Sequence, residues 1–433
     1  MTNRNECRTI GHMAVKTKYR HIKPDFKLRE TPLFKRLASL EPVSARNTLP
    51  LTWAKAKDFT VWDDRGNKWI DMTSGIFVAN AGHANPKIKA AIKRQLDSDL
   101  LFAYNYPTDI KKRFIEKLLA LSPKHFNAMT LLNSGSEAMD TAYKLIKLYG
   151  NKTGKKYIVS FTGNYHGRGL SNDLISRGKS NAAWSGVTDP GVVFLDFPYD
   201  KHAKFDPGKL PRGKEIAGFV IETFQGWGCW MYPKQFLRDL YTFAKKNKAL
   251  VCFDEMQSGF YRMGPLYGYM TYSDFKPDIL GLGKGISSSL PLSAVLSRKE
   301  LFDIDENADL HGTHSGNALC VAAGLANLEF LSSRTEIERR KKTFAIFKRE
   351  LRALEQSPLI RQVNVSGLIA GIIFEKKEDS MAIVRDCVSR GVLLMLIPRN
   401  SIKLAPPMTI TAQAIREALR VLREAIKRRE MNV

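Results

Sequence analysis

The region from about residue 128 to 300 constrains the fold most, because short β-rich runs alternate there with longer helical patterns. β-Branched and aromatic residues dominate the short runs, and the longer segments repeat apolar residues at helical spacing. This alternation predicts a mostly parallel sheet with helices on both faces. In such sheets ligands bind at the carboxyl ends of the strands. The polar residues that follow the apolar runs are therefore candidates for a site: residues 134–136, residues 163–168, Glu222 and Asp254.

Segments on both sides of this region complete the predicted architecture. Residues 40–80 read as short strands, with a hairpin expected around Arg65, Gly66 and Asn67. From about residue 320 long helices and a few strands follow, ending in an amphipathic helical pattern. Because 433 residues exceed what one hydrophobic core usually serves, we expect two domains. The predicted parts are a basic, disordered N-terminal tail (1–35), the N-terminal segment of a small domain (36–80), a large domain (81–318) and a C-terminal small domain (319–433).

The chain is strongly basic, with 68 Lys and Arg against 43 Asp and Glu and a net charge of +25. Such a charge attracts polyanions, which raises nucleic acid as a partner. The basic residues are spread along the chain, however, and no zinc-finger, basic-zipper or RNA-recognition signature accompanies them. We therefore expect no specific nucleic-acid binding. A scaffold that binds polyanions through charge alone is the non-enzymatic alternative.

Cysteine and histidine usage limits the compartment and the metal chemistry. The five cysteines are odd in number, widely separated and mostly set in apolar runs, as reduced and buried thiols are. A reducing, cytoplasmic location is expected. No apolar run approaches the roughly 18 residues of a membrane span, so no membrane association is expected. His311 and His314 have metal-like spacing but no further ligand cluster, so we expect no metal.

The segment "NSGSEAMD" follows a predicted strand and opens a predicted helix. Ser134 can cap this helix, and Glu137 can close a capping box with it. The backbone N–H groups of Gly135 and Ser136 then remain free at the positive end of the helix, which favours an anion. A plain capped helix without a ligand is the structural alternative.

Two further strand ends carry candidate residues. In "FTGNYHGRG", Tyr165 can stack on a flat ligand and Arg168 can hold a carboxylate, although a surface turn explains the loop equally well. In "ALVCFDE", Asp254 and Glu255 end a very apolar strand. A carboxylate there must be paired, because its desolvation alone costs several kcal/mol. Asp254 either forms a structural salt bridge or holds a protonated ring nitrogen.

Lys284 is the one charged residue in "PDILGLGKGISSSLPLSAVL". Gly283 and Gly285 flank it, so neighbouring side chains do not block its approach to a ligand. A partly desolvated lysine has a lowered pKa and becomes nucleophilic. A phosphate-binding loop is excluded, because the sequence lacks both the upstream glycine and the Ser or Thr after the lysine. A surface lysine on a glycine loop remains the alternative.

Together these residues supply what pyridoxal 5′-phosphate (PLP) needs: an anion site, a stacking aromatic ring, a carboxylate for the ring nitrogen and a lysine for the aldehyde. The sequence also resembles the class III (ω-amino-acid) aminotransferases, which have the fold type I architecture. The resemblance runs from about residue 45 to the end. It is carried by "VWDDRGNKWIDMTSGIFVANAGHANPKI", "NSGSEAMDTAYKL", "YHGR", "IETFQGWG", "DEMQSGFYRMG", "GKGISSSLPLSAVL", "THSGNALC" and "KLAPPM".

The resemblance implies a large domain built on a mostly parallel, seven-stranded sheet, and a smaller α+β domain from the N- and C-terminal parts. It also implies roles for individual residues. Lys284 would form the Schiff base with PLP and shuttle the Cα proton, Asp254 would keep the pyridine nitrogen protonated, and Tyr165 would stack on the ring. The remaining cofactor contacts would come from Gly135, Ser136, Glu222, Gln257 and Thr313.

Within that set, Gly135 and Ser136 would bind the phosphate, Gln257 the phenolic oxygen, and Glu222 would lie near the cofactor. Thr313 matches the residue that reaches the phosphate from a neighbouring subunit. The resemblance therefore implies a homodimer, or a higher oligomer, with shared active sites.

Two positions depart from the pattern of relatives that use glutamate. Those relatives carry a Glu and an Arg where this chain has Trp227 and Lys403. Tryptophan cannot pair with lysine as Glu pairs with Arg, so the usual switch between carboxylated and uncarboxylated substrates is in question. Arg168 matches an arginine that contacts a substrate carboxylate, and Phe77 would line an apolar substrate entry.

The predicted activity is a ping-pong transamination from an amine or amino acid, ω-amino groups included, to a 2-oxo acid. The alternative within the same family is an aminomutase or an amino-acid epimerase, which returns the amino group to the same molecule.

Overall fold

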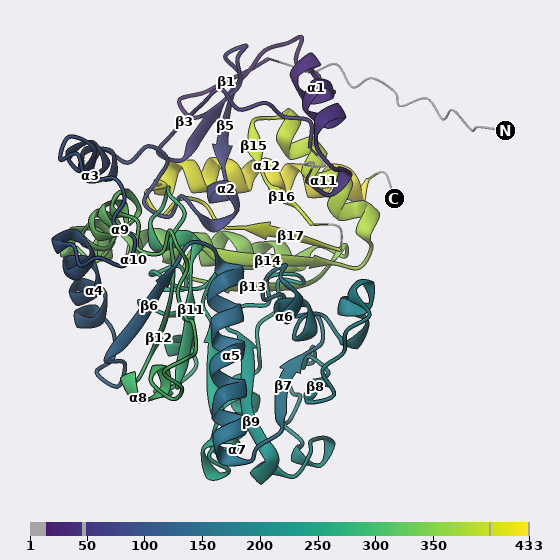
Figure 1. Ribbon diagram of the computed structural model, residues 1–433. Coiled ribbons are helices and arrows are strands. Elements are labelled where there is room, and N and C mark those ends of the chain that lie inside the picture. Colours follow the sequence, from purple (N-terminus) through teal and green to yellow (C-terminus); the bar gives the residue numbers. More distant parts are fainter. Residues whose placement is uncertain (1–13, 46–48, 398–399, 432–433) are drawn as a thin grey trace.

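The computed structural model describes residues 14–45, 49–397 and 400–431 (Figure 1). Cys7 and the first 13 residues of the predicted tail lie outside this part of the chain. No helix in the described ranges is long and apolar enough to cross a membrane.

A seven-stranded sheet forms the centre of the described chain. Six of its strands run in one direction, and β12 is antiparallel to both of its neighbours. This confirms the predicted mostly parallel sheet. Across the sheet the strands are β6 (Ala128–Leu132), β12 (Ser293–Ser297), β11 (Ile279–Leu282), β10 (Leu250–Asp254), β9 (Ile216–Glu222), β7 (Tyr157–Phe161) and β8 (Val192–Leu195).

Helices cover both faces of this sheet, as predicted. Helix α5 (Gly135–Thr153) crosses the front of the sheet in Figure 1, where its apolar side chains pack with Val220 and Cys252. Helix α7 (Lys234–Lys246) belongs to the core of the opposite face, with Phe219 and Phe253. Successive strand residues point to opposite faces, so strands buried on both sides are apolar throughout.

A second sheet lies near the N-terminus. Its strands are, in spatial order, β1 (Val15–Lys16), β2 (His21–Ile22), β5 (Lys68–Asp71), β4 (Thr60–Trp62) and β3 (Lys55–Lys57), and β15 (Val392–Leu393) pairs with β5. The predicted hairpin is confirmed: β4 and β5 are antiparallel, and the Asp63 carboxylate accepts hydrogen bonds from the backbone N–H groups of Arg65 and Asn67. The prediction of a disordered tail is wrong for residues 15–22, because burial of Tyr19 and Ile22 holds β1 and β2 on the sheet.

A third, antiparallel sheet belongs to the C-terminal part. It contains β13 (Ile360–Ser366), β14 (Ile369–Phe374), β17 (Ser401–Leu404) and β16 (Met395–Leu396). The long helices beside it are α10 (Arg334–Arg352), α11 (Lys377–Ser389) and α12 (Ala412–Glu430). The remaining helices of at least four residues are α1 (Pro32–Leu40), α2 (Ser74–Phe77), α3 (Pro86–Leu96), α4 (Asp109–Leu121), α6 (Leu170–Leu174), α8 (Lys299–Phe302), α9 (Ala318–Leu331), and the 3-10 helices η2 (Lys179–Ser185), η5 (Gly268–Thr271) and η7 (Ala353–Gln356).

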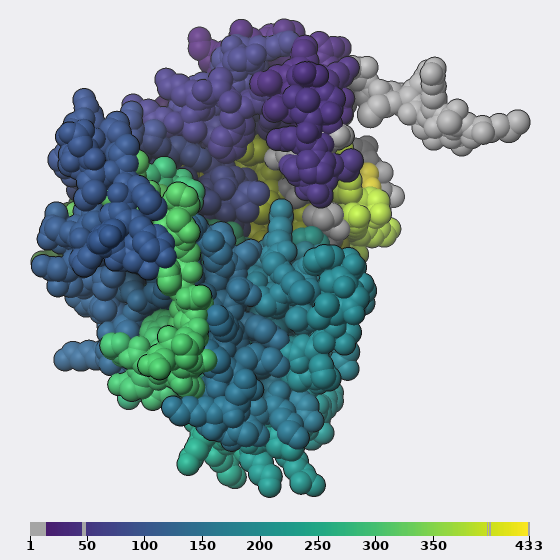
Figure 2. Space-filling view, viewed as in Figure 1, coloured from purple at the N-terminus to yellow at the C-terminus, as the bar shows by residue number. Residues whose placement is uncertain are grey.

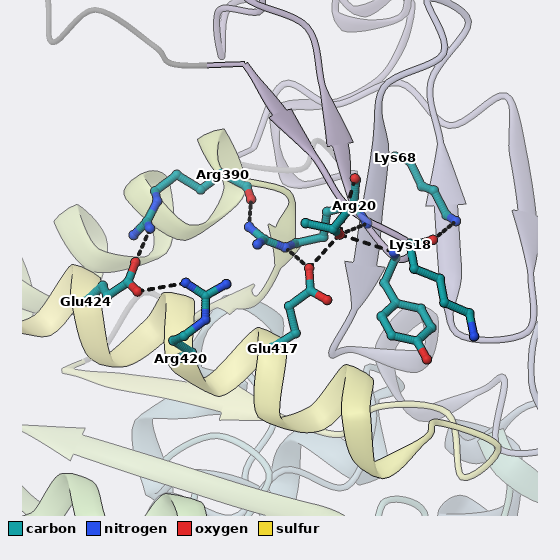
Figure 3. A network of polar contacts seen from close by, with 9 residues as sticks. Lys18, Arg20, Lys68, Arg390, Glu417, Arg420 and Glu424 are labelled. Carbon is teal, nitrogen blue, oxygen red and sulfur yellow. Dashed lines mark hydrogen bonds and ion pairs between the residues drawn. The ribbon is translucent and has the colours of Figure 1, made fainter.

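The polar face of α12 holds the N-terminal strands in place (Figure 3). Glu417 accepts a hydrogen bond from Arg20 Nε at 2.7 Å, and Arg20 also donates to the backbone oxygen of Arg390 at 2.5 Å. Glu424 on the same helix pairs with Arg390. Partly buried pairs of this kind are less screened by salt than exposed ones.

The N- and C-terminal parts of the chain lie together beside the central sheet, as the purple and yellow segments of Figure 2 show. The backbone N–H of Ala405 donates to Met72 O at 2.7 Å, and Ser74 Oγ donates to Ala405 O at 2.6 Å. The buried Arg262 adds hydrogen bonds to Leu368 O and Ser74 Oγ. Residues 72–74 and 405 are thereby fixed next to the strand ends of the large sheet.

Candidate active site

The carboxyl ends of β9 and β10 bring two carboxylates together. These strands are parallel, and Glu222 lies in register opposite Asp254. Both side chains are buried. Because buried carboxylates must be paired or hydrogen-bonded, their partners define the site.

Asp254 is held by two donors. Its Oδ2 lies 2.9 Å from His166 Nδ1, and its Oδ1 accepts a hydrogen bond from the backbone N–H of Met256 at 3.0 Å. His166 is itself buried. His166 lies in the same loop as Tyr165, and no local sequence pattern shows which strand end that loop meets, so its contact with Asp254 was not predicted.

Glu222 connects two loops of the site. It accepts hydrogen bonds from the backbone N–H of Tyr165 at 2.8 Å and of Gly226 at 3.0 Å. Burial and, to a smaller extent, the nearby charge of Asp254 raise the pKa of Glu222 to about 7, against the lowering effects of His166 and the two N–H donors.

This raised pKa makes the stability of the cofactor-free protein depend on pH. As pH rises, the unfolded chain loses the Glu222 proton near the ordinary Glu pKa of 4.5, whereas the native state keeps this proton up to about pH 7. The free energy of unfolding should therefore fall as pH rises from about 4.5 to about 7. Denaturant titrations at pH 5 and pH 8 should show that the difference between wild type and Glu222→Gln changes by about 3 kcal/mol. If the difference in free energy of unfolding between wild type and Glu222→Gln is the same at both pH values, the raised pKa of Glu222 is wrong.

Lys284 begins the short 3-10 helix η6 (Lys284–Ile286) immediately after β11. Its backbone is in the left-handed region, at φ 43, and its side chain is half-buried. Burial lowers the pKa of Lys284, the charge of Asp254 opposes this, and the charge of Lys403 adds to it. The flanking glycines allow close packing: a Cβ on Gly285 would lie 2.1 Å from Asn80 Nδ2.

The N-terminus of α5 lies beside the strand ends that carry Asp254 and Lys284. The predicted capping box is confirmed there. Ser134 Oγ accepts from the backbone N–H of Glu137 at 3.2 Å, and Glu137 Oε2 accepts from that of Ser134 at 2.7 Å. Ser136 Oγ accepts a hydrogen bond from the backbone N–H of Arg168 at 3.1 Å. A Cβ on Gly135 would lie 2.8 Å from Met256 Sδ, close to the strand end that carries Asp254.

Lys403 reaches the site from β17 of the C-terminal sheet. Its buried ammonium group donates to Gly226 O and, at 3.0 Å, to Gln257 Oε1. Burial lowers the pKa of Lys403. Its Nζ also lies 5.3 Å from the centre of the Phe77 ring. The structure thus brings Lys403, Gln257 and Phe77 together.

Phe77 belongs to an unusual turn. Ser74, Gly75, Ile76 and Phe77 have φ of 53, 57, 65 and 68, so α2 is a left-handed turn. This conformation costs non-glycine residues roughly 1–2 kcal/mol each. Hydrogen bonds from Ser74 Oγ to Ala405 O and from Arg262 to Ser74 help to hold it. Strained segments of this kind concentrate at functional sites.

Two aromatic rings lie at the outer part of the site. The rings of Tyr165 and Trp227 are 6.1 Å apart and inclined by 20°. Arg168, which is exposed, donates from Nε to Tyr165 Oη at 3.0 Å. Arg177, which the sequence analysis did not select, has its Cζ 4.3 Å from the centre of the Trp227 ring.

Thr313 is exposed on the loop before α9, and the described residues show no hydrogen bond between it and the residues above. His311 and His314, on the same loop, lie beside Tyr104 and Phe102. Within the described ranges, no group of three or more His, Cys, Asp or Glu side chains is arranged to hold a metal.

Comparisons with known proteins identify the family. Residues 42–426 match the model of "Aminotransferase class-III". The chain belongs to the class-III aminotransferase family. This family is PLP-dependent, and the protein is a class-III transaminase.

Curated relatives of this aminotransferase span most of its length. The 2-aminoadipate transaminase of Pseudomonas putida is 31% identical, with 87% of this chain and 96% of the relative covered. The acetylornithine aminotransferase of Bacillus subtilis is 30% identical over 86% of this chain and 94% of its own. The isoleucine 2-epimerase of Lentilactobacillus buchneri is 29% identical over 84% and 87%.

The fold of this aminotransferase is that of solved relatives. The ornithine aminotransferase from Toxoplasma gondii superposes with a TM-score of 0.81 at 22% identity, covering 94% of this chain and 100% of the other. The predicted α/β fold with its seven-stranded, mostly parallel sheet is confirmed.

Proposed function

We propose that this transaminase works by a ping-pong cycle in which Lys284 binds PLP covalently, an amine or amino acid gives up its amino group, and a 2-oxo acid receives it. When bound, PLP supplies an electron sink for the carbanion formed at the substrate's Cα. The observation that carries the proposal is a half-buried lysine of lowered pKa that lies near enough to the buried Asp254 for the charge of this carboxylate to act on it.

The chemistry of the surrounding side chains fits PLP. Asp254, oriented by His166 and the Met256 N–H, offers a carboxylate to a protonated ring nitrogen. The helix end at Gly135 and Ser136 offers donors and a positive dipole to a phosphate. Tyr165 offers an aromatic face, and Gln257 an amide for the phenolic oxygen. Glu222 fixes the backbone of Tyr165.

Lys284 has the properties of the residue that moves the proton at the substrate's Cα. Its lowered pKa leaves a larger neutral fraction of the amine near neutral pH, and a neutral amine can accept a proton and return it. Its half-buried position limits the access of water to that proton.

Substrate recognition is proposed to combine apolar and cationic walls. Phe77 and Trp227 supply the apolar surface, Lys403 lies beside the Phe77 ring, and the exposed Arg168 is available for a carboxylate. Two relatives are named for 2-aminoadipate and acetylornithine, which supports an amino-acid donor for this enzyme too.

The functional unit is proposed to be a homodimer, or a higher oligomer, in which Thr313 of one subunit completes the phosphate site of the other. Thr313 is exposed, and an exposed apolar stretch lies beside its loop, with Asn317 Nδ2 donating to Leu101 O at 3.0 Å. Contiguous exposed apolar residues mark interfaces. They are Leu96, Leu100, Leu101, Phe102, Tyr104 and Tyr106.

A cytoplasmic location is also proposed. Among the described cysteines, Cys252, Cys320 and Cys387 form no disulfide within the described part of the chain, and Cys252 and Cys387 are buried. Burial raises the pKa of the Cys387 thiol, so the group stays protonated and unreactive.

The ping-pong proposal is tested by supplying one amino acid at a time, with and without 2-oxo acids. Without an acceptor, product formation should stop at one equivalent per active site, and adding the acceptor should restore steady turnover. Sustained conversion of a single amino acid without an acceptor would instead establish an aminomutase or epimerase. The relative named isoleucine 2-epimerase makes this the second candidate.

A further inference from the structure

Arg177 is a cation at the outer part of the site to which no role has yet been given. It follows α6, and its guanidinium carbon lies 4.3 Å from the centre of the Trp227 ring and 5.3 Å from that of Tyr165. A guanidinium group is attracted to aromatic faces at such distances. Arg177 therefore packs on Trp227, which is proposed to line the substrate site, and on Tyr165, which is proposed to stack on the cofactor ring.

The Arg177 guanidinium is incompletely satisfied. Its side chain is half-buried, and its Nε is buried without a hydrogen-bond partner in the described part of the chain. A buried donor without an acceptor is costly, and more so when it is charged. An anionic ligand at this position would remove that cost.

The backbone of Arg177 has a conformation that arginine disfavours. Its φ is 59, in the left-handed region that arginine rarely adopts. The backbone N–H of Arg177 donates to Asn164 O at 2.9 Å, and that of Gly163 donates to Arg177 O at 3.3 Å. Both partners belong to the loop of Tyr165, so the strained residue is tied to the site itself. Observed strain of this kind is a reason to look for function.

Lys403 is poorly suited to bind a second substrate carboxylate. Its buried ammonium already donates to Gly226 O and Gln257 Oε1. Turning it toward a substrate would leave both acceptors unpaired. Arg168 and Arg177 differ from it, because both contact Tyr165 and neither is bound to a carboxylate of the described chain.

We propose that Arg177 binds a second carboxylate of the substrate, so that the preferred 2-oxo acid is a dicarboxylate held by Arg168 at one end and Arg177 at the other. A planar guanidinium recognises a carboxylate with two parallel hydrogen bonds, which the ammonium of lysine cannot do. A monocarboxylate leaves Arg177 unpaired. This inference rests on the proposed function, because it assumes a 2-oxo acid acceptor.

The test compares wild type with Arg177→Gln, using 2-oxoglutarate and pyruvate as acceptors. The variant should raise KM for 2-oxoglutarate at least about tenfold, with kcat little changed, and leave KM for pyruvate within about twofold. Arg177→Lys keeps the charge without the planar fork, so its KM for 2-oxoglutarate should lie between those of wild type and Arg177→Gln. Lys179→Gln removes an exposed charge two residues away and should change neither value. Equal effects on both acceptors, or none, would overturn the proposal.

Binding measurements separate this proposal from the function on which it rests. Calorimetric titration of the holoenzyme with glutarate and with butyrate needs no turnover. Glutarate should bind wild type and Lys179→Gln at least about tenfold more tightly than Arg177→Gln, whereas butyrate should not distinguish them. If amino transfer fails but this difference is found, the proposed function is wrong and the Arg177 site stands. If wild type does not prefer glutarate, the Arg177 proposal is wrong, whatever the activity.

Discussion

Replacement of Lys284 by alanine is expected to reduce kcat for amino transfer by at least about ten-thousandfold, because one side chain is proposed both to bind the cofactor and to move the Cα proton. The loss should appear in each half-reaction when it is followed separately in single-turnover experiments. The change removes one half-buried side chain and leaves Asp254 and its partners in place, so the fold should be retained.

The matched control for Lys284→Ala is Lys155→Ala. Burial also lowers the pKa of Lys155, but its Nζ donates to Lys214 O and Asn247 O, away from the site. This control should keep kcat within about twofold while losing some stability. Added methylamine should restore part of the activity of Lys284→Ala and should leave the activity of Lys155→Ala unchanged. More than one tenth of wild-type kcat in Lys284→Ala would reject its proposed role.

The second large effect is expected from Asp254→Asn, which should lower kcat by about a thousandfold. Asparagine keeps the size of the side chain but removes the negative charge that would hold a protonated ring nitrogen. The buried His166 then loses the carboxylate that orients it. Rates of each half-reaction and retention of PLP after dialysis measure the effect on chemistry and on binding separately.

Glu255→Gln provides the control for Asp254→Asn, because the next residue is also a buried carboxylate. Glu255 accepts hydrogen bonds from Thr223 Oγ1 at 2.6 Å and from the backbone N–H groups of Gly268 and Tyr269. Its change should lower the free energy of unfolding by about 1–3 kcal/mol with little effect on kcat. If the two variants lose activity equally, the role proposed for Asp254 is not specific.

Strand ends explain why much of the site was predictable from sequence. Glu222, Asp254 and Lys284 each follow an apolar run, and parallel strands bring such positions to one edge of a sheet. The capping box at Ser134 is equally local, since it depends on residues three apart. Predictions of this kind need only the strand directions and the helix start.

The rest of the site depends on contacts between distant segments. His166 faces Asp254 across 88 positions of sequence, and Lys403 reaches Gln257 across 146. No local pattern specifies such pairs. The left-handed turn at residues 74–77 is also hidden, because Ile76 is β-branched and its own preference is for extended backbone. Tertiary hydrogen bonds to Ala405 and Arg262 override that preference.

The junction between Ser74 and Ala405 has a consequence for the order of events during synthesis. These residues are separated by 331 positions, and β15 must pair with β5 from the far end of the chain. Domains fold as their residues leave the ribosome, so the central sheet can form before β15 is available to pair with the edge of β5. Until β15 has been synthesised, that unpaired edge can form hydrogen bonds with strands of other chains, and we expect chaperones to bind it.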